Sequence, residues 1–222
     1  MEEHHYTQEE FQKAIRVWFA LQGDATFRLN YPLTSDSVIL DVGGYHGDWT
    51  QAMLNRYHCR SYVFEPVPDF ARGIKKRFEE HPEVTIFEAG LGAETGKRQM
   101  EIEQDASSAY REVGNHPTID IHYVGICDFL EILSSAGQKT HIDVIKINIE
   151  GGEYELLEKI CAAGVASCFQ SIQVQFHNIP QIHAEERMKR IWKELAKTHR
   201  LTWNFRPYVW ENWERRKDCA GV

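Results

Sequence analysis

From residue 37 onward, short apolar runs alternate with longer segments whose apolar residues recur at helical spacing. Runs with the length and composition of strands buried on both faces of a sheet occupy residues 38–42, 61–65, 84–88, 143–149 and 171–176. Segments with helical periodicity occupy residues 48–57, 69–80, 127–136, 153–163 and 184–199. This alternation predicts an α/β fold of the doubly wound type, with a mostly parallel sheet and helices on both faces.

Three segments depart from this rhythm. Residues 90–125 suggest only two strands, at 98–103 and 119–124, joined by a polar loop. Ahead of the sheet, Phe11, Ile15, Trp18 and Phe19 lie on one face of an expected helix. We therefore predict an N-terminal helical arm (1–36) and a main domain (37–222). The aromatic residues of 201–213 suit core packing or the stacking of a sugar ring, and packing is favoured.

A glycine-rich turn follows the first strand and precedes a helix. The sequence from Asp41 to Gly47 has the spacing D-x-G-G-x-x-G. Glycine is needed where a chain turns sharply or where a ligand approaches the backbone. The spacing differs from the G-x-G-x-x-G dinucleotide fingerprint, so binding of a nicotinamide cofactor is disfavoured. A carboxylate at this strand end suits a ligand with an ammonium or sulfonium group, although a purely structural turn is an alternative.

A second carboxylate, Glu65, ends the next strand and precedes Pro66. It follows Asp41 at close to the ~20-residue separation at which an acidic residue accepts hydrogen bonds from ribose hydroxyls. A surface glutamate before a proline turn is the alternative. Combined with the glycine turn, Glu65 predicts a nucleoside site.

Polar residues cluster on the two remaining apolar strands. The run from 141 to 153 contains Lys146, Asn148 and Glu150, and the run from 172 to 177 ends in His177. Polar groups in a buried strand are costly unless they are paired or used. Glu150 and His177 at adjacent strand ends form a plausible general-base pair, because an unperturbed histidine has a pKa of about 6.5. A buried histidine satisfied by its neighbours is the alternative.

The combined motifs resemble those of the FkbM-type S-adenosylmethionine-dependent methyltransferases. The resemblance covers roughly residues 38–177 and rests on L-D-V-G-G-Y-H-G (40–47), V-F-E-P (63–66), I-D-V-I-K-I-N-I-E-G-G-E (142–153) and Q-V-Q-F-H (173–177). It implies a seven-stranded Rossmann-like methyltransferase sheet and S-adenosylmethionine as cofactor. Family members commonly methylate the oxygen of sugars or of hydroxylated natural products.

The resemblance also implies roles for individual residues. The predicted catalytic residues are Lys146, Asn148, Glu150 and His177. The predicted cofactor-binding residues are Asp41, Gly43, Gly44, Tyr45, Gly47, Asp48, Glu65, Pro66, Gly90 and Leu91. Ser107 and Ser108 are added as candidates from their position in the irregular polar loop, where a plain surface turn is the alternative. Asn148 and Gln175 stand where the family more often has an acid. Because divalent cations prefer charged oxygen ligands, we predict no metal and a metal-independent reaction.

Charge and composition limit the classes of partner that the protein can bind. The chain has 25 Lys and Arg against 33 Asp and Glu, which argues against a nucleic-acid partner held by phosphate contacts. Neither a basic-then-apolar N-terminus nor a long apolar run is present, so a cytoplasmic protein without a membrane span is expected. The predicted function is O-methylation of a sugar, glycan or hydroxylated small molecule. A non-catalytic S-adenosylmethionine- or nucleoside-binding module and an N-methyltransferase are the alternatives.

Overall fold

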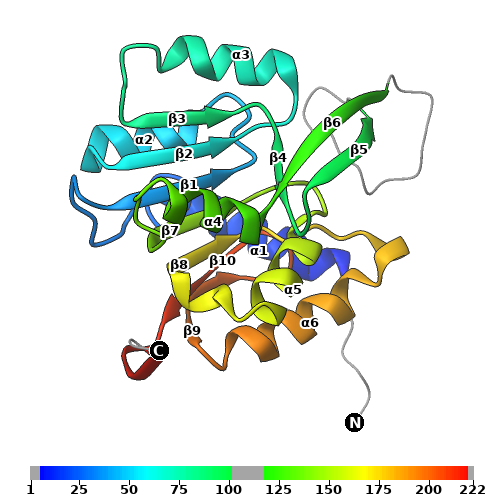
Figure 1. Cartoon of the computed structure of the whole chain (residues 1–222). Helices are drawn as coiled ribbons and strands as arrows, with labels where there is room; N and C mark the ends of the chain where they lie inside the picture. The colour runs from blue at the N-terminus through cyan, green and yellow to red at the C-terminus, as the bar shows by residue number, and fades with distance from the viewer. Residues whose placement is uncertain (1–5, 102–117, 220–222) are drawn as a thin grey trace.

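The main sheet of the computed structural model has the predicted α/β architecture. The structure describes residues 6–101 and 118–219. Seven strands lie side by side in the order β3 (Val84–Phe87), β2 (Arg60–Phe64), β1 (Val38–Val42), β7 (Ile142–Ile147), β8 (Phe169–Val174), β10 (Trp210–Arg215) and β9 (His199–Phe205). Neighbouring strands from β3 to β8 are parallel, whereas β10 runs antiparallel to β8 and β9 (Figure 1). The predicted mostly parallel, seven-stranded sheet is confirmed.

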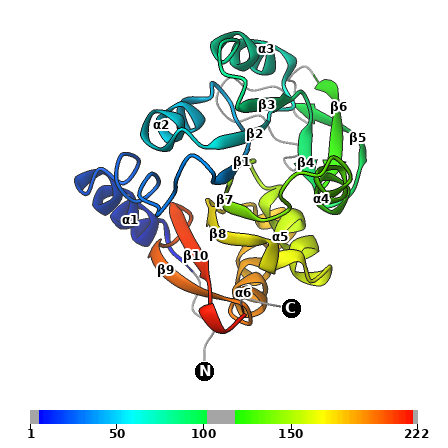
Figure 2. The same ribbon diagram turned by 60° about the vertical axis from the view of Figure 1, so that its left-hand side comes forward.

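Helices cover both faces of the sheet because successive side chains of a strand point to opposite faces. The α-helices of the described residues are α1 (Gln8–Ala20), α2 (Asp48–Tyr57), α3 (Pro68–Arg77), α4 (Ile126–Ser135), α5 (Glu153–Ala162) and α6 (Ala184–Leu195). In β1, Leu40 belongs to the same buried cluster as residues of α4, α5 and α6, whereas Ile39 packs with Trp49 and Met53 of α2. Figure 2 shows α2 on one side of the sheet and α4, α5 and α6 on the other. All of β1 is consequently buried, so its carboxyl end lies in the interior.

A second, three-stranded sheet accounts for the irregular segment. It has the order β4 (Gly90–Gly92), β6 (Thr118–Gly125) and β5 (Gly96–Glu101). Two of its strands match the predicted 98–103 and 119–124, but β4 was not predicted. This strand consists of two glycines and one leucine, so it shows no alternation of apolar and polar residues. A Cβ at Gly90 would lie 2.5 Å from the Tyr123 ring. Glycine is therefore required there by packing against the neighbouring strand.

The predicted N-terminal helix is present and packs against the last two strands. Trp18 shares a buried cluster with Trp210, and Trp203 and Phe205 pack against that cluster. The aromatic C-terminal segment is thus used in packing, as favoured from the sequence. Phe19 was predicted to lie on the buried face but is 67% exposed. The helix instead buries the face that carries Ala14 and Trp18. In the described part of the chain, no helix is both long enough and apolar enough to span a bilayer.

Candidate active site

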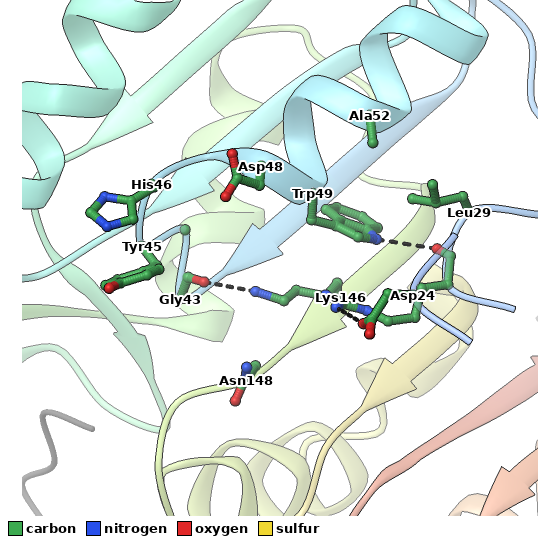
Figure 3. A pocket seen from close by; sticks show the side chains of 12 residues that line it. Asp24, Leu29, Gly43, Tyr45, His46, Asp48, Trp49, Ala52, Lys146 and Asn148 are labelled. Atoms are coloured by element: carbon green, nitrogen blue, oxygen red, sulfur yellow. Dashed lines mark hydrogen bonds and ion pairs between the residues drawn. The ribbon is translucent and has the colours of Figure 1, made fainter. Parts of the chain in front are cut away.

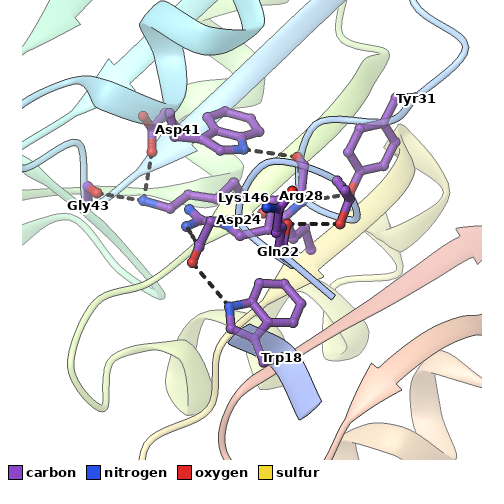
Figure 4. A network of polar contacts seen from close by, with 11 residues as sticks. Trp18, Gln22, Asp24, Arg28, Tyr31, Asp41, Gly43 and Lys146 are labelled. Carbon is purple, nitrogen blue, oxygen red and sulfur yellow. Dashed lines mark hydrogen bonds and ion pairs between the residues drawn. The ribbon is translucent and has the colours of Figure 1, made fainter. Parts of the chain in front are cut away.

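A buried ion pair joins the carboxyl ends of β1 and β7. Asp41 lies opposite Lys146 in the parallel pairing of these strands, and Lys146 Nζ donates to Asp41 Oδ1 over 2.9 Å and to the Gly43 carbonyl over 2.7 Å (Figure 4). The other carboxylate oxygen, Oδ2, accepts from Thr50 Oγ1 over 2.7 Å. Burial lowers the pKa of Lys146, while Asp41 opposes that shift. The charges of both predicted residues are thus neutralised within the protein.

The glycine turn is imposed by the protein's own packing. Gly43 has a φ of 85°, and a Cβ there would lie 2.1 Å from the carbonyl oxygen of Asn148. Gly44 and Gly47 are equally crowded, since their Cβ atoms would approach Val63 and Phe78 to 2.5 and 2.8 Å. We expected close ligand approach to demand these glycines. Contact with neighbouring elements is sufficient to demand them.

Glu65 lies just beyond β2 and is 4% exposed. Its Oε2 accepts from the Tyr45 backbone N–H over 2.8 Å, and its Oε1 accepts from that of Val67 over 2.9 Å. Burial raises the pKa of Glu65 to about 7, although both hydrogen bonds and Lys146 oppose this shift. Each carboxylate oxygen has a second lone pair, so the group retains capacity for ribose hydroxyls. It is also fixed in place by the turn that contains Tyr45.

A cavity of about 310 Å³ opens beside the glycine turn. Its walls come from four segments: the turn itself, the first turns of α2, the end of β7, and the stretch that precedes β1 (Figure 3). Predicted site residues that line it are Gly43, Gly44, Tyr45, Asp48, Lys146 and Asn148. The structure therefore brings together six predicted residues from two separate motifs.

The side chain of Asn148 carries a buried oxygen with unsatisfied hydrogen-bonding capacity. Asn148 Oδ1 is buried and has no hydrogen-bond partner among the described residues. A buried acceptor without a donor costs roughly 1–3 kcal/mol, so such atoms require an explanation. Asn148 also lines the cavity, but Oδ1 itself is shielded from solvent, so a ligand donor in the cavity would reach it only after the amide group rotates.

An ionisable cluster lies beyond the ends of β7 and β8. His177 Nε2 is 3.2 Å from Glu150 Oε1, and Nδ1 makes a short contact with Glu153 Oε1. Glu153 is fully buried and also accepts from the Gly151 backbone N–H over 2.8 Å. The predicted neighbours Glu150 and His177 are thus in contact, and Glu153 is a third member that had no role in our sequence interpretation.

The protonation state of His177 differs from the one assumed from the sequence. Burial by itself would lower the pKa of His177, but the charges and hydrogen bonds of Glu153 and Glu150 outweigh it and raise the pKa to about 10. At neutral pH the ring carries a proton on both nitrogens. The sequence-based prediction of His177 as the base started from the unperturbed pKa of about 6.5, and the raised pKa instead favours the protonated ring.

The remaining predicted residues have other positions. Asp48 lines the cavity while pairing with Arg77 over 2.6 Å. Pro66 is half-buried after Glu65, and Leu91 is a core residue with 1% exposure. Glu65, Pro66, Gly90 and Leu91 are not among the residues that line the cavity. Ser107 and Ser108 fall outside the described residues.

Sequence reasoning missed one wall of the cavity. Asp24, Arg28 and Leu29 line it from the stretch between α1 and β1. These three residues fall in the predicted N-terminal arm (1–36), to which the sequence analysis assigned no site residue. A buried glutamine in β8 was the available signal, since Gln173 Oε1 accepts from Arg28 Nε over 3.2 Å.

Comparison with known protein families identifies the enzyme class. The model of the methyltransferase FkbM domain matches residues 41–202, well over half of the chain. The chain belongs to the FkbM methyltransferase family. This match confirms the family that the sequence motifs predicted. No curated protein matches the chain.

Solved structures share the fold of this FkbM methyltransferase at low sequence identity. A Plasmodium falciparum dimethyladenosine transferase has a TM-score of 0.51 and 13% identity, over 90% of this chain and 62% of its own. This chain therefore spans less than two thirds of that relative. A Clostridium thermocellum protein described as an rRNA methylase has a TM-score of 0.52 and 10% sequence identity. That match covers 88% of this chain and 94% of the C. thermocellum protein. A Streptococcus mutans protein described as a methyltransferase, in complex with S-adenosylhomocysteine, has a TM-score of 0.51 and 10% sequence identity. That match covers 89% of this chain and 97% of the S. mutans protein.

Within the FkbM methyltransferase match lie the glycine turn, Glu65, Asn148 and the Glu150–His177–Glu153 cluster. Asp24 and Arg28 precede its first residue. The cavity is consequently built partly from the family's domain and partly from a segment outside it.

Proposed function

We propose that this FkbM methyltransferase transfers a methyl group from S-adenosylmethionine to a hydroxyl of a sugar, a glycan or a hydroxylated small molecule. The observation that carries the proposal is the Glu150–His177–Glu153 cluster, one short loop away from the unpartnered Asn148 Oδ1. Transfer to an alcohol needs a group that removes a proton, and a carboxylate of this cluster can accept one.

Two groups fit the proposed cofactor. The Glu65 carboxylate retains lone pairs for the ribose hydroxyls. Asn148 lines the cavity, and its buried Oδ1 could accept from an ammonium group once the amide rotates toward the ligand. When bound, S-adenosylmethionine supplies an activated methyl group on a sulfonium centre. The glycine turn and Tyr45 complete the proposed cofactor site, to which we also assign Asp41, Gly47, Asp48 and Pro66.

The cluster divides the acid–base work between its members. Because His177 holds a proton on each nitrogen, Glu150 is the group that accepts the proton of the attacking hydroxyl. The proton moves from the hydroxyl oxygen to the Glu150 carboxylate, and the oxygen becomes the nucleophile. The His177 cation lies 3.2 Å from Glu150 and favours the ionised Glu150 carboxylate, the form that can accept a proton. Glu153 orients the ring from the other side, so it is a positioning residue.

Lys146 and Asn148 contribute to the geometry of the site. Lys146 holds the Gly43 carbonyl and the buried Asp41, which makes it a positioning residue. The amides at 148 and 175 replace carboxylates that a divalent cation would prefer, so we propose a metal-independent reaction. The surplus of acidic residues favours an acceptor other than nucleic acid.

A methyl-transfer screen tests this function. The full chain is incubated with S-adenosylmethionine and with sugars, nucleotide sugars, glycan fragments, amines and a structured RNA, and products are read by mass. We expect a gain of one methyl on a hydroxyl compound, equal with and without a chelator, and its loss in Glu150→Gln. Methylation of an amine or of RNA, or loss of activity with chelator, would contradict the corresponding part of the proposal.

A further inference from the structure

The stretch between α1 and β1 is held rigidly against the sheet. The Arg28 carbonyl accepts from Trp49 Nε1 of α2 and from Gln173 Nε2 of β8, each over 3.1 Å. Tyr31 contacts the same amide, since its hydroxyl accepts from Gln173 Nε2 over 2.7 Å, and it donates to Asn212 Oδ1 over 3.0 Å. Side chains from α2, β8 and β10 thus fix this segment. Its position at the cavity is a built feature of the fold.

The Arg28 guanidinium is fixed in the same way (Figure 4). Its Nε donates to Gln173 Oε1 over 3.2 Å, its Nη1 donates to Asp24 Oδ1 over 2.7 Å, and its carbon lies 4.0 Å from the centre of the Trp210 ring. The side chain is only 16% exposed. Among the described residues no group accepts from Nη2. A held guanidinium with an open edge is suited to a carboxylate.

Asp24 is fixed too, and it supplies the opposite charge. Trp18 Nε1 donates to Asp24 Oδ2 over 3.1 Å. Asp24, Arg28 and Asn148 line the cavity, and Figure 3 shows the side chains of Asp24 and Asn148 there. Lys146, which also lines the cavity, is already paired with Asp41 and the Gly43 carbonyl. From the described residues the cavity therefore offers the open Nη2 of Arg28, whose Nη1 is paired with Asp24, together with the Asp24 carboxylate and the Asn148 amide.

This charge pattern complements an α-amino acid, in which one carbon carries a carboxylate and an ammonium group. We propose that Arg28 binds the carboxylate and that Asp24 with Asn148 binds the ammonium of the amino-acid end of S-adenosylmethionine. The proposal rests on the proposed function, because it names the subsite in which that cofactor's amino-acid end is held. It assigns a cofactor-binding role to a segment that precedes the family's domain match.

Binding to three nucleosides separates this subsite from the rest of the cofactor site. S-adenosylhomocysteine carries both charged groups, its decarboxylated analogue carries only the ammonium, and methylthioadenosine carries neither. Titration calorimetry on the full wild-type chain should give an affinity for S-adenosylhomocysteine at least tenfold above that for methylthioadenosine. Equal affinities would overturn the subsite and leave the proposed function intact, whereas no binding of any of the three would overturn both.

Variants assign the contacts to residues. Arg28→Gln should weaken S-adenosylhomocysteine by about tenfold to a hundredfold, as expected for hydrogen bonds to a charged group, and change methylthioadenosine less than about twofold. Asp24→Asn should weaken both ligands that carry the ammonium. The exposed Arg16 of α1 provides the control Arg16→Gln, which should change nothing. If Arg28→Gln lowered the affinity for all three ligands equally, or left the affinity for S-adenosylhomocysteine unchanged, the assignment would be overturned. If that variant does not fold, the comparison of the three ligands on the wild-type chain decides the question.

Discussion

Two groups of buried polar residues occupy neighbouring strand ends, and they differ in how completely they are paired. In the β1 network (Asp41, Thr50, Lys146 and the Gly43 carbonyl), each charged side chain has its partners inside the protein. In the β7–β8 cluster (Asn148, Glu150, Glu153 and His177), one buried acceptor lacks a partner and an imidazolium lies between two carboxylates. Burial and charge alone therefore do not mark a reactive site. Unused bonding capacity beside a cavity is the better sign.

The largest expected effect is loss of stability from the β1 network. Lys146→Met keeps the volume but leaves Asp41 charged and buried, and breaking such a pair costs about 3–5 kcal/mol. Chemical denaturation should show this loss in the free energy of unfolding. Adding Asp41→Asn should recover part of it, since the unpaired charge is removed. The exposed Lys193 of α6 gives the control Lys193→Met, and an equally small effect at 146 would show that the network is not structural.

Glu150→Gln in the β7–β8 cluster should affect turnover without affecting the fold. We expect a fall in kcat of about a hundredfold, because the group that accepts the proton is lost. The melting temperature and the affinity for S-adenosylhomocysteine should stay at wild-type values. Glu131→Gln, at an exposed position of α4, is the matched control. If the kcat of the wild type instead rose with pH around pH 6.5, the base would be a neutral His177 and not Glu150.

Glu65 should make cofactor affinity depend on pH. Its pKa of about 7 in the free protein means that the acceptor form, the carboxylate, is the minor species at pH 6 and the major one at pH 8. Affinity for S-adenosylhomocysteine should therefore rise about tenfold from pH 6 to pH 8. In Glu65→Gln the profile should be flat and the affinity lower at pH 8. A flat profile in the wild type would mean that Glu65 does not hold the ribose.

The elements near the site could be predicted from sequence because their signals are local. The strand at 38–42 and the helix at 48–57 coincide with β1 and α2, since a buried apolar run, a glycine turn and an amphipathic segment follow one another directly. The last helix was predicted to reach 199 but ends at Leu195, and β9 begins at His199. Helix ends are harder to locate, because the apolar stripe that marks a helix does not mark its last turn.

Interactions between residues far apart in the chain could not be predicted from the sequence. Asp41 was interpreted as facing a cationic cofactor, but the register of β1 and β7 pairs it with Lys146. Arg28 and Gln173 are 145 positions apart, and no local pattern connects them. The pKa of His177 likewise depends on Glu153, which faces it only after α5 has packed beside β8. Residue types at strand ends could be predicted, whereas their partners depend on the folded chain.

The missing partner of Asn148 tests the central claim most directly. Asn148→Ala and the wild type are compared for melting temperature without ligand and for titration with S-adenosylhomocysteine. If the unpartnered Oδ1 is reserved for the cofactor, its removal leaves the melting temperature unchanged or raised and weakens binding about tenfold. A variant that melts lower than the wild type yet binds S-adenosylhomocysteine equally well would contradict the claim, because Asn148 would then serve the fold.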